Sequence, residues 1–312
     1  MNSRSPITET SAPESTVFTL DDLDRWSFDG VSLAVLGFPV KHSISPSMHN
    51  AALRKMAETD PRFAQWRYFK FAVPPEDLAR ALPLFYEKRF RGINLTIPHK
   101  ILAVDQVAEV DPAAAATGAI NTLLWRPEGY RGFNTDGYGL AKGIETAFRV
   151  KLKGSELVLL GAGGAARAAA VLAVQEGCRR LFLGNRTLGK LEPLQKDLHR
   201  LGGATEIRIF DLASPPTEWQ SAPIVVNATS AGLKSDDPAP VDLAAFPAGT
   251  LVYDMIYNPA APSLVRAARV RGLQAANGLS MLVYQGVRAL EIWSDATVPE
   301  DVMRQAAEAA AG

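Results

Sequence analysis

The stretch from residue 157 to residue 187 constrains the fold more than any other part of the chain. An apolar run at 157–160 ends in the turn Gly-Ala-Gly-Gly at 161–164, an alanine-rich helical pattern follows, and a second apolar run occupies 181–183. Strand, glycine turn, helix and strand in this order form half of a doubly wound α/β fold. Glycines let the backbone approach a pyrophosphate, and the helix N-terminus offers amide groups to it. The stretch predicts a Rossmann-like dinucleotide-binding lobe; the alternative is a tight turn that binds no ligand.

The residues after the second apolar run indicate which dinucleotide is bound. Chains that bind NAD usually place Asp or Glu about 20 residues after the glycines, where it binds the ribose 2′-hydroxyl. Here that place holds Asn185-Arg186-Thr187. An acid would repel a 2′-phosphate and Arg186 would attract one, with roughly 1.5–3 kcal/mol for a charge-assisted hydrogen bond. We therefore predict NADP as the cofactor; a solvated loop arginine is the alternative for Arg186.

Length and composition narrow the remaining classes. The 312 residues favour more than one domain, and 33 basic against 33 acidic residues give a net charge of zero. This balance does not favour nucleic acid or an acidic membrane surface as a partner. The single cysteine, Cys178, excludes an intrachain disulfide, and the four histidines show no metal-ligand spacing. We expect a small-molecule substrate, no metal, and a monomer or homodimer.

The chain shows no signal for export or membrane insertion. Residues 1–16 are rich in Ser, Thr, Pro and Glu and lack an apolar core, so we expect a disordered tail rather than a secretory signal. No apolar run approaches the length of roughly 18 residues that a membrane span needs. We therefore expect a cytoplasmic protein in which residues 1–30 form a flexible extension with a short helix that begins near Thr19.

Apolar periodicity predicts an α/β lobe before the glycine turn and a parallel sheet after it. The first lobe is expected to have strands at 33–36, 68–73 and 92–97, a hairpin at 120–125 and 130–133, and helices at 46–57, at 75–86 and from the third strand to 110. The second lobe is expected to have strands at 157–160, 181–183, 206–210, 224–227, 250–253 and 273–275. Further helices are predicted at 137–148, 279–293 and 299–310.

Two serines follow the first predicted strand. Ser43 and Ser45 are two residues apart, and in an extended segment this spacing points both hydroxyl groups the same way. Neighbouring hydroxyl groups can hold a carboxylate. Ser45 before Pro46 is also a favourable helix N-cap, and both roles stay open.

A second polar group follows the third predicted strand. Asn94 and Thr96 are expected on one strand face, with Ile93, Leu95 and Ile97 on the other. Lys100 falls in the first turn of the next helix, where a cation opposes the helix dipole. It is therefore not placed for helix stability, although a solvated lysine remains the alternative.

Four further polar residues stand among apolar neighbours or near element ends. Asn121 lies in GAINTLLW, and Gln285 lies on the late apolar helix, where it needs partners if buried. Asp136 starts the helix between the lobes, where a turn or N-cap role is the alternative. Tyr257 lies just past a strand end, where open α/β sheets bind ligands.

Together these segments resemble the shikimate dehydrogenase family. The matching signatures are GFPVKHSISPSMHN, GINLTIPHK, GAINTL, FNTDG, GAGGAARA, NRT, NATS, YDMIYNP and NGLSMLVYQ, and they follow the family's order over about residues 31–290. The resemblance implies NADPH-dependent, reversible reduction of 3-dehydroshikimate to shikimate in aromatic amino acid (chorismate) biosynthesis. It also implies a substrate lobe at 31–136 and 278–312, to which the C-terminal helices return, an NADP-binding lobe at 137–277, and a reaction in the cleft between them.

The resemblance further assigns roles to individual residues. Ser43, Ser45 and Tyr257 would bind the substrate carboxylate. The ring hydroxyl groups would be bound by four polar side chains from three segments: Asn94, Thr96, Asn121 and Gln285. Lys100 and Asp136 would form the catalytic pair. The cofactor would be bound by the glycine turn and by loops of the second lobe: Gly161, Ala162, Gly163, Gly164, Ala165, Asn185, Arg186, Thr187, Lys190, Asn227, Thr229, Gly278 and Met281.

The chemistry suits this catalytic pair. Hydride addition to a ketone carbon leaves an alkoxide, which Lys100 can stabilise and protonate. Asp136 can orient the ammonium group, and the cofactor supplies the organic chemistry.

The chain departs from the family pattern at four positions. Asn277 and Ser280 stand where Asp and Gly are common, Pro262 replaces a frequent threonine, and Lys190 stands where arginine is common. These changes affect the expected cofactor contacts more than the substrate.

Two alternatives stay open at this point. One is a quinate/shikimate dehydrogenase paralogue, which rates on the two substrates would distinguish. The other is a non-catalytic sensor of a shikimate-pathway ligand, which would bind shikimate without turnover.

Overall fold

The computed structural model describes residues 13–234 and 236–311, and the chain divides into two compact units. Of the described residues, unit 1 comprises those up to Thr135 together with Gly286–Ala310, and unit 2 comprises those from Asp136 to Gln285 together with Ala311. Residues 1–12 of the predicted tail lie outside the described residues. Within 13–16, the Thr16 amide donates to the Pro13 carbonyl and Glu14 forms an ion pair with Arg54.

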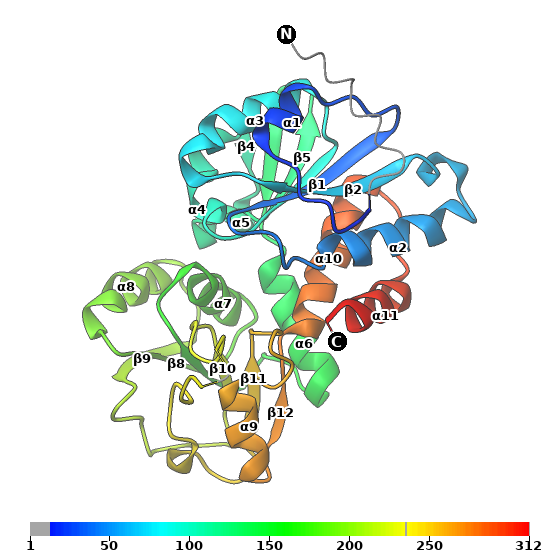
Figure 1. The fold of residues 1–312 in the computed structure, drawn as a ribbon. Coiled ribbons are helices and arrows are strands. Elements are labelled where there is room, and N and C mark those ends of the chain that lie inside the picture. The colour runs from blue at the N-terminus through cyan, green and yellow to red at the C-terminus, as the bar shows by residue number, and fades with distance from the viewer. Residues whose placement is uncertain (1–12, 235, 312) are drawn as a thin grey trace. The chain divides into compact units, whose positions relative to one another are not determined.

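A six-stranded sheet in the order β2-β1-β3-β5-β6-β4 forms the centre of unit 1 (Figure 1). Its strands are β1 (Val31–Gly37), β2 (Trp66–Ala72), β3 (Gly92–Leu95), β4 (Glu109–Val110), β5 (Thr122–Arg126) and β6 (Gly129–Phe133). β1 pairs in parallel with β2 and β3, so the carboxyl ends of these three strands meet at one edge. β5 and β6 form the predicted antiparallel hairpin.

Helices cover both faces of this sheet. The α-helices are α1 (Leu20–Asp24), α2 (Ser45–Ala57), α3 (Leu78–Glu87), α4 (His99–Leu102), α5 (Pro112–Thr117), α11 (Glu300–Ala311) and the second part of α10 (Leu279–Ser294). Short 3-10 turns are η2 (Pro61–Phe63), η3 (Pro75–Asp77) and η4 (Val104–Gln106). α1 and α3 pack on one face, and α2 and α10 lie against the other (Figure 1).

An aromatic cluster fills the space between the sheet and α3. Trp26 packs edge-to-face on Phe69 with 4.7 Å between ring centroids, and Phe85 packs in the same way on Phe90. Edge-to-face pairs add about 0.5–1.5 kcal/mol beyond the burial of their area. The α1 helix joins this core through buried Leu20 and Leu23, and a capping box of Thr19 and Asp22 fixes its start, as the sequence predicts.

The predicted helix from the third strand to residue 110 is wrong. The helix α4 ends at Leu102, a 3-10 turn follows, and Glu109 and Val110 form the edge strand β4 beside β6. The third strand also ends earlier than expected, at Leu95, so Ile97 leaves the core face and is 75% exposed. The backbone here is redirected by pairing with a hairpin about 20 residues later in the chain, which the local pattern does not contain.

Unit 2 contains a second six-stranded sheet, in which every pairing is parallel, in the order β12-β11-β10-β7-β8-β9 (Figure 1). Its strands are β7 (Glu156–Leu160), β8 (Arg180–Asn185), β9 (Glu206–Asp211), β10 (Ile224–Asn227), β11 (Leu251–Asp254) and β12 (Gln274–Ala276). Its helices are α6 (Asp136–Phe148), α7 (Gly164–Gln175), α8 (Glu192–Arg200), α9 (Ser263–Val270) and the first part of α10, with 3-10 turns η5 (Leu188–Lys190) and η6 (Leu243–Ala245). This arrangement confirms the predicted α/β fold with a Rossmann-like second lobe.

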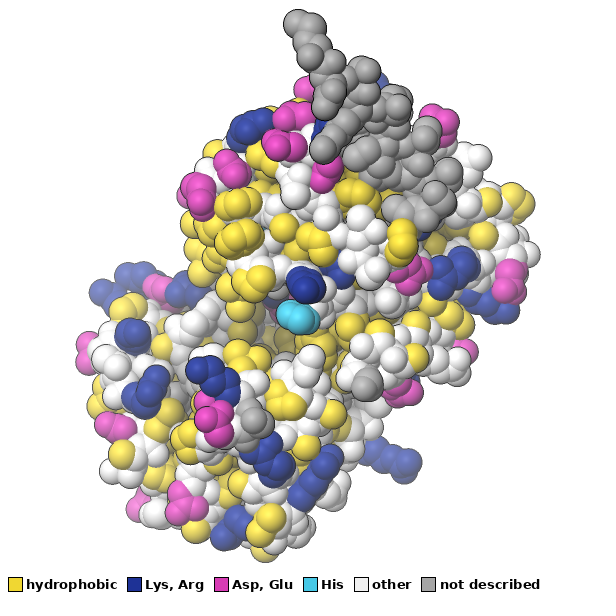
Figure 2. All heavy atoms as spheres, viewed as in Figure 1, with side chains coloured by type: hydrophobic (Ala, Val, Ile, Leu, Met, Phe, Trp, Pro, Cys, Tyr) yellow, Lys and Arg dark blue, Asp and Glu magenta, His cyan; other side chains and the backbone are white. Residues whose placement is uncertain are grey.

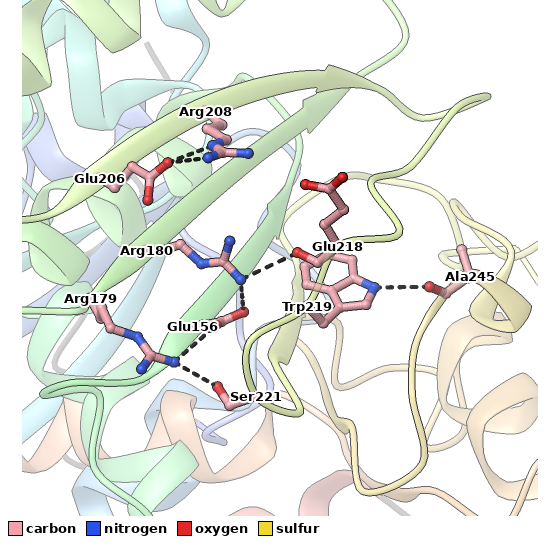
Figure 3. A network of polar contacts seen from close by, with 9 residues as sticks. All are labelled: Glu156, Arg179, Arg180, Glu206, Arg208, Glu218, Trp219, Ser221 and Ala245. Atoms are coloured by element: carbon pink, nitrogen blue, oxygen red, sulfur yellow. Dashed lines mark hydrogen bonds and ion pairs between the residues drawn. The ribbon is translucent and has the colours of Figure 1, made fainter.

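A buried ion network stabilises the amino-terminal edge of this sheet (Figure 3). Glu156 at the start of β7 is fully buried and accepts hydrogen bonds of 2.7 Å from both Arg179 and Arg180. Burial alone would raise the pKa of Glu156, but the two guanidinium groups outweigh burial and lower this pKa. Arg180 also donates to the Glu218 carbonyl, so the network holds the loop before β10 against the sheet.

On the molecular face in Figure 2, basic and acidic side chains are scattered among hydrophobic ones. Of the helices within 13–234 and 236–311, none is both long and apolar enough to cross a membrane. Over the same described ranges, no group of three or more His, Cys, Asp or Glu side chains is placed to hold a metal ion. Cys178 is buried, and burial raises the pKa of its thiol to about 11, as expected for a packing residue.

Candidate functional site

The glycine turn of unit 2 leaves an open approach to the start of α7. Gly163 is the N-cap of α7 in an extended conformation, and apart from its neighbours in the chain no atom of the described residues lies within 4 Å of the position that a Cβ would occupy there. Gly161 has φ of +120°, a value that strongly favours glycine. No side chain caps the helix, so its first amide groups are available to a ligand. The turn therefore has the shape that a pyrophosphate needs.

The segment after β8 carries the positive charges predicted for this edge. Asn185 ends the strand, and its side chain donates to the Thr187 carbonyl at 2.9 Å, which shapes the loop. Arg186, Thr187 and Lys190 are exposed. Within the described part of the chain, no carboxylate forms an ion pair with Arg186 or Lys190. Both cations can therefore meet an anionic ligand.

The loop after β10 is held by a buried amide and a buried carboxylate. Asn227 accepts from the Thr229 amide and hydroxyl at 2.9 and 2.7 Å and donates to the carboxylate of Asp254. Both Asn227 and Asp254 are fully buried. Burial raises the pKa of Asp254 to about 6, against the opposing hydrogen bonds from Asn227 and the Ile256 amide. Asn227 shapes this loop rather than presenting its own side chain.

In unit 1, the loops after β1 and β3 contact each other. The Phe38 amide donates to the Ile97 carbonyl, and the Thr96 amide donates to Leu36. A Cβ on Gly37 would lie 2.2 Å from the Thr96 methyl group, so glycine is required for this approach. The contact brings the serine segment and the segment with Thr96 and Lys100 to one edge of the sheet.

The two serines lie at the start of α2. Ser45 is the first residue of the helix, and its amide is 3.4 Å from the Ser43 hydroxyl. The N-cap is Ile44, which makes no side-chain cap, so the alternative N-cap role of Ser45 is not used. The Ser45 side chain instead contacts the hydroxyl group of Tyr68, whose pKa burial raises well above its ordinary value.

Asn94 lies at the centre of a buried hydrogen-bond network. Its Oδ1 accepts from the Tyr68 hydroxyl at 2.8 Å, and its Nδ2 donates to the Asn121 carbonyl and the Thr122 hydroxyl at 3.1 Å each. Asn121 Oδ1 in turn accepts from the Thr135 amide at 2.8 Å. An amide group has two N–H donors, and both donors of Asn94 are used. Toward a ligand, Asn94 can therefore act only as an acceptor.

Lys100 is half-buried in the short helix α4. Its carbonyl accepts from the Ile120 amide at 2.8 Å, which connects this helix to the segment that carries Asn121. Thr96 precedes the helix, and its carbonyl accepts from the His99 amide. In unit 1 the structure thus brings together the segments of all six residues predicted there: Ser43, Ser45, Asn94, Thr96, Lys100 and Asn121.

The other three residues predicted for catalysis or substrate binding belong to unit 2. Asp136 is buried at the start of α6, and Gln285 is buried on α10. A Cβ on Gly139 would lie 2.6 Å from the Met281 carbonyl and 3.0 Å from the Gln285 Cβ, so α6 and α10 pack closely here. Tyr257 is half-buried after β11, and burial raises its pKa.

Comparison with known proteins finds matches to one enzyme family in both the N-terminal and the C-terminal part of the chain. The shikimate dehydrogenase substrate-binding domain matches residues 35–123, and the shikimate 5′-dehydrogenase C-terminal domain matches residues 278–308. The shikimate dehydrogenase (NADP(+)) of Symbiobacterium thermophilum is 40% identical over 285 residues, which cover 90% of this chain and 95% of that protein. The chain belongs to the shikimate dehydrogenase family.

Solved structures agree with this assignment. A shikimate dehydrogenase crystallised with NADP+ has a TM-score of 0.83 at 31% identity and covers 91% of this chain and 96% of its own. The shikimate 5-dehydrogenase of Thermus thermophilus, solved with NADP(H) and shikimate, has a TM-score of 0.78 at 33% identity, with 90% and 99% covered.

Two departures from the shikimate dehydrogenase pattern are accommodated inside unit 2. Asn277 accepts from the Leu279 amide at the start of α10 and donates to the Ala260 carbonyl. The Ser280 hydroxyl lies 2.9 Å from the Tyr253 hydroxyl, so the extra side chain has a partner. Gly278 allows a close approach of two backbone segments, because a Cβ there would lie 2.1 Å from the Met255 carbonyl.

Sequence reasoning missed several polar residues on the face of the unit 1 sheet that carries Asn94. The His49 ring stacks on the Tyr68 ring with 4.1 Å between centroids, and it contacts the Ser45 carbonyl at 2.8 Å. Lys70 lies two residues after Tyr68 on β2. The signal was available: β2 alternates, with Phe69 and Phe71 on one face and Tyr68 and Lys70 on the other.

Proposed function

We propose that this chain catalyses the reversible, NADP-dependent reduction of 3-dehydroshikimate to shikimate, as an enzyme of aromatic amino acid biosynthesis. The observation that carries this conclusion is the match at 40% identity, over nearly the full length, to a shikimate dehydrogenase (NADP(+)). The site geometry of each unit supports it: polar side chains gather at one sheet edge of unit 1, and unit 2 has an open glycine turn with basic residues.

The residues of unit 2 fit NADP. The open space at Gly163 and the uncapped start of α7 suit a pyrophosphate, and exposed Arg186 and Lys190 suit a 2′-phosphate. We assign the cofactor to four segments, which are the glycine turn, the loop after β8, the loop after β10 and the start of α10: Gly161, Ala162, Gly163, Gly164 and Ala165; Asn185, Arg186, Thr187 and Lys190; Asn227 and Thr229; Gly278 and Met281. When bound, the cofactor supplies the hydride.

The residues of the chain bind the substrate and move the proton. Ser43 and Ser45 hold the carboxylate through their hydroxyl groups, with Tyr257. The ring hydroxyl groups are bound by Asn94, Thr96, Asn121 and Gln285, with Asn94 as an acceptor. Lys100 stabilises the developing negative charge on the carbonyl oxygen and donates a proton to it, while Asp136 orients the ammonium group.

The test is NADP+ reduction by shikimate, followed by absorbance, in the wild type and in Lys100→Ala. We expect turnover in the wild type and a fall in kcat of about 10²–10⁴-fold in the variant, since general acid–base groups contribute this much. NADP+ binding, measured by fluorescence titration, should be unchanged. Lys88→Ala, on the α3 side of unit 1, is the matched control and should keep full activity.

Quinate is measured in the same assay. A higher kcat/KM for quinate than for shikimate would contradict the substrate assignment. Binding of shikimate without turnover by the wild type would contradict the proposed activity itself.

A further inference from the structure

Lys70 is a buried lysine on the sheet face that carries the proposed substrate residues, and none of the roles above uses it. It is 4% exposed. Lys70 pairs with Val35 of β1, Val35 with Asn94 of β3, and Asn94 with Thr122 of β5. Residues paired across neighbouring strands point to the same face of a sheet. Lys70 therefore shares a face and a transverse row with Asn94.

The ammonium group of Lys70 holds the loop that leads to the serines. It donates to the Lys41 carbonyl at 3.1 Å and to the Ser43 carbonyl at 3.2 Å. Two residues after Ser43, the Ser45 side chain contacts Tyr68, which lies on the same strand as Lys70. Lys70 is thus attached directly to the backbone of the segment that presents both hydroxyl groups.

The charge of Lys70 has no counterion among residues 13–234 and 236–311. No carboxylate in these ranges lies within ion-pair distance, and burial lowers the pKa of Lys70. An ammonium group has three donors, and the two carbonyl groups use two of them. A buried charge without a partner is costly, and an anion that binds nearby relieves part of this cost. Such an attraction is screened much less than one at the surface.

We propose that Lys70 determines the specificity of this site for an anionic substrate group. It positions the 41–43 loop so that Ser43 and Ser45 present their hydroxyl groups, and its positive charge favours a carboxylate there over a neutral group of similar shape. The inference rests on the proposed function, because the carboxylate is that of shikimate.

The experiment compares shikimate with its methyl ester, which keeps the ring and removes the charge. KM and kcat are measured for both substrates in the wild type, Lys70→Met and Lys70→Gln. In both variants we expect KM for shikimate to rise at least tenfold, with kcat within threefold of the wild type. KM for the methyl ester should rise by a clearly smaller factor, because the ester loses only the positioning of the serines, so the variants lose the preference for the acid.

Lys55→Met is the matched control, because Lys55 lies exposed on α2 and its loss changes the net charge equally. Its kinetic constants should equal those of the wild type. Lys70→Gln keeps an amide donor for the loop carbonyl groups, so it tests the charge even where Lys70→Met fails to fold; thermal melting checks the fold of each.

Two results would overturn the proposal. Equal increases in KM for the acid and the ester would show that Lys70 only supports the loop, and an unchanged preference for the acid would show that its charge is irrelevant. A wild type that does not turn over shikimate would instead contradict the proposed function. The experiment therefore distinguishes a failure of the proposed function from a failure of the role of Lys70.

Discussion

At the residue scale, we propose that the side chain of Arg186 selects NADP over NAD. It is exposed after β8, where an NAD-binding chain would place an acid. Arg186→Ala should raise KM for NADP+ about ten- to a hundredfold, the equivalent of one charge-assisted hydrogen bond, and leave KM for NAD+ unchanged. Arg271→Ala, an exposed arginine at the end of α9, is the control. A similar rise in KM for both cofactors would contradict selection through the 2′-phosphate.

A substitution at Gly163 should weaken NADP+ binding and leave the stability of the fold nearly unchanged. Its φ of −84° is open to any residue, and a Cβ there would contact no residue of 13–234 and 236–311 beyond its neighbours in the chain. Gly163→Ala should therefore change the free energy of unfolding by less than about 1 kcal/mol, the scale of an N-cap substitution. At the proposed cofactor site this methyl group would lie where the pyrophosphate approaches, so NADP+ affinity should fall at least tenfold. Urea denaturation and fluorescence titration measure the two effects, and unchanged affinity would place the cofactor elsewhere.

At the element scale, Glu156 of β7 adds a buried ion pair with Arg180 of β8 to the pairing of these strands. Glu156→Gln leaves the Arg180 guanidinium buried without a counter-charge, and breaking a buried pair in this way costs about 3–5 kcal/mol. Glu206→Gln breaks an exposed ion pair between Glu206 and Arg208, which both lie on the next strand, β9. For this variant we expect a loss of about 0–1 kcal/mol in the free energy of unfolding. Urea denaturation of the two variants at pH 7 measures the difference. Equal losses would mean that the buried network contributes no more than a surface pair.

The same scale shows how far the sequence predicts the fold and the site. The βαβ unit around Gly163 is local, so its glycines and apolar runs predict its order of elements, although β8 (Arg180–Asn185) is longer than the predicted 181–183. Lys100 was expected on a long helix, but α4 is only four residues long because the chain turns to pair β4 with β6. The hydrogen bonds of Asn94 connect three strands. The sequence could not predict them either, because they follow from the order of strands in the sheet and not from the spacing of residues along the chain.

At the scale of the whole molecule, the two units carry buried groups with opposite responses to pH. In unit 1, burial lowers the pKa of His49 from 6.5 to about 4, against the opposing hydrogen bond to Ser45. The unfolded chain then binds a proton that the folded unit does not, so stability is lost as pH falls from 6.5 toward 4. In unit 2, burial raises the pKa of Asp254 from 3.8 to about 6. The folded unit keeps a proton that the unfolded chain releases, so stability is lost as pH rises from 3.8 toward 6.

Each shift corresponds to about 3 kcal/mol across its window, at 1.36 kcal/mol per pKa unit. Subtracting the free energy of unfolding of each variant from that of the wild type isolates the contribution of one group. For His49→Gln this difference should fall by up to about 3 kcal/mol between pH 6.5 and 4.5, and for Asp254→Asn it should rise by a similar amount over the same change. Urea denaturation at pH 4.5, 5.5 and 6.5 gives both differences. Because the two units need not unfold together, hydrogen exchange of β1 and β10 amides assigns each change to its unit. If the two differences changed with pH in the same direction, the pKa shifts of His49 and Asp254 would be contradicted. Opposite directions are expected because a base is buried in one unit and an acid in the other.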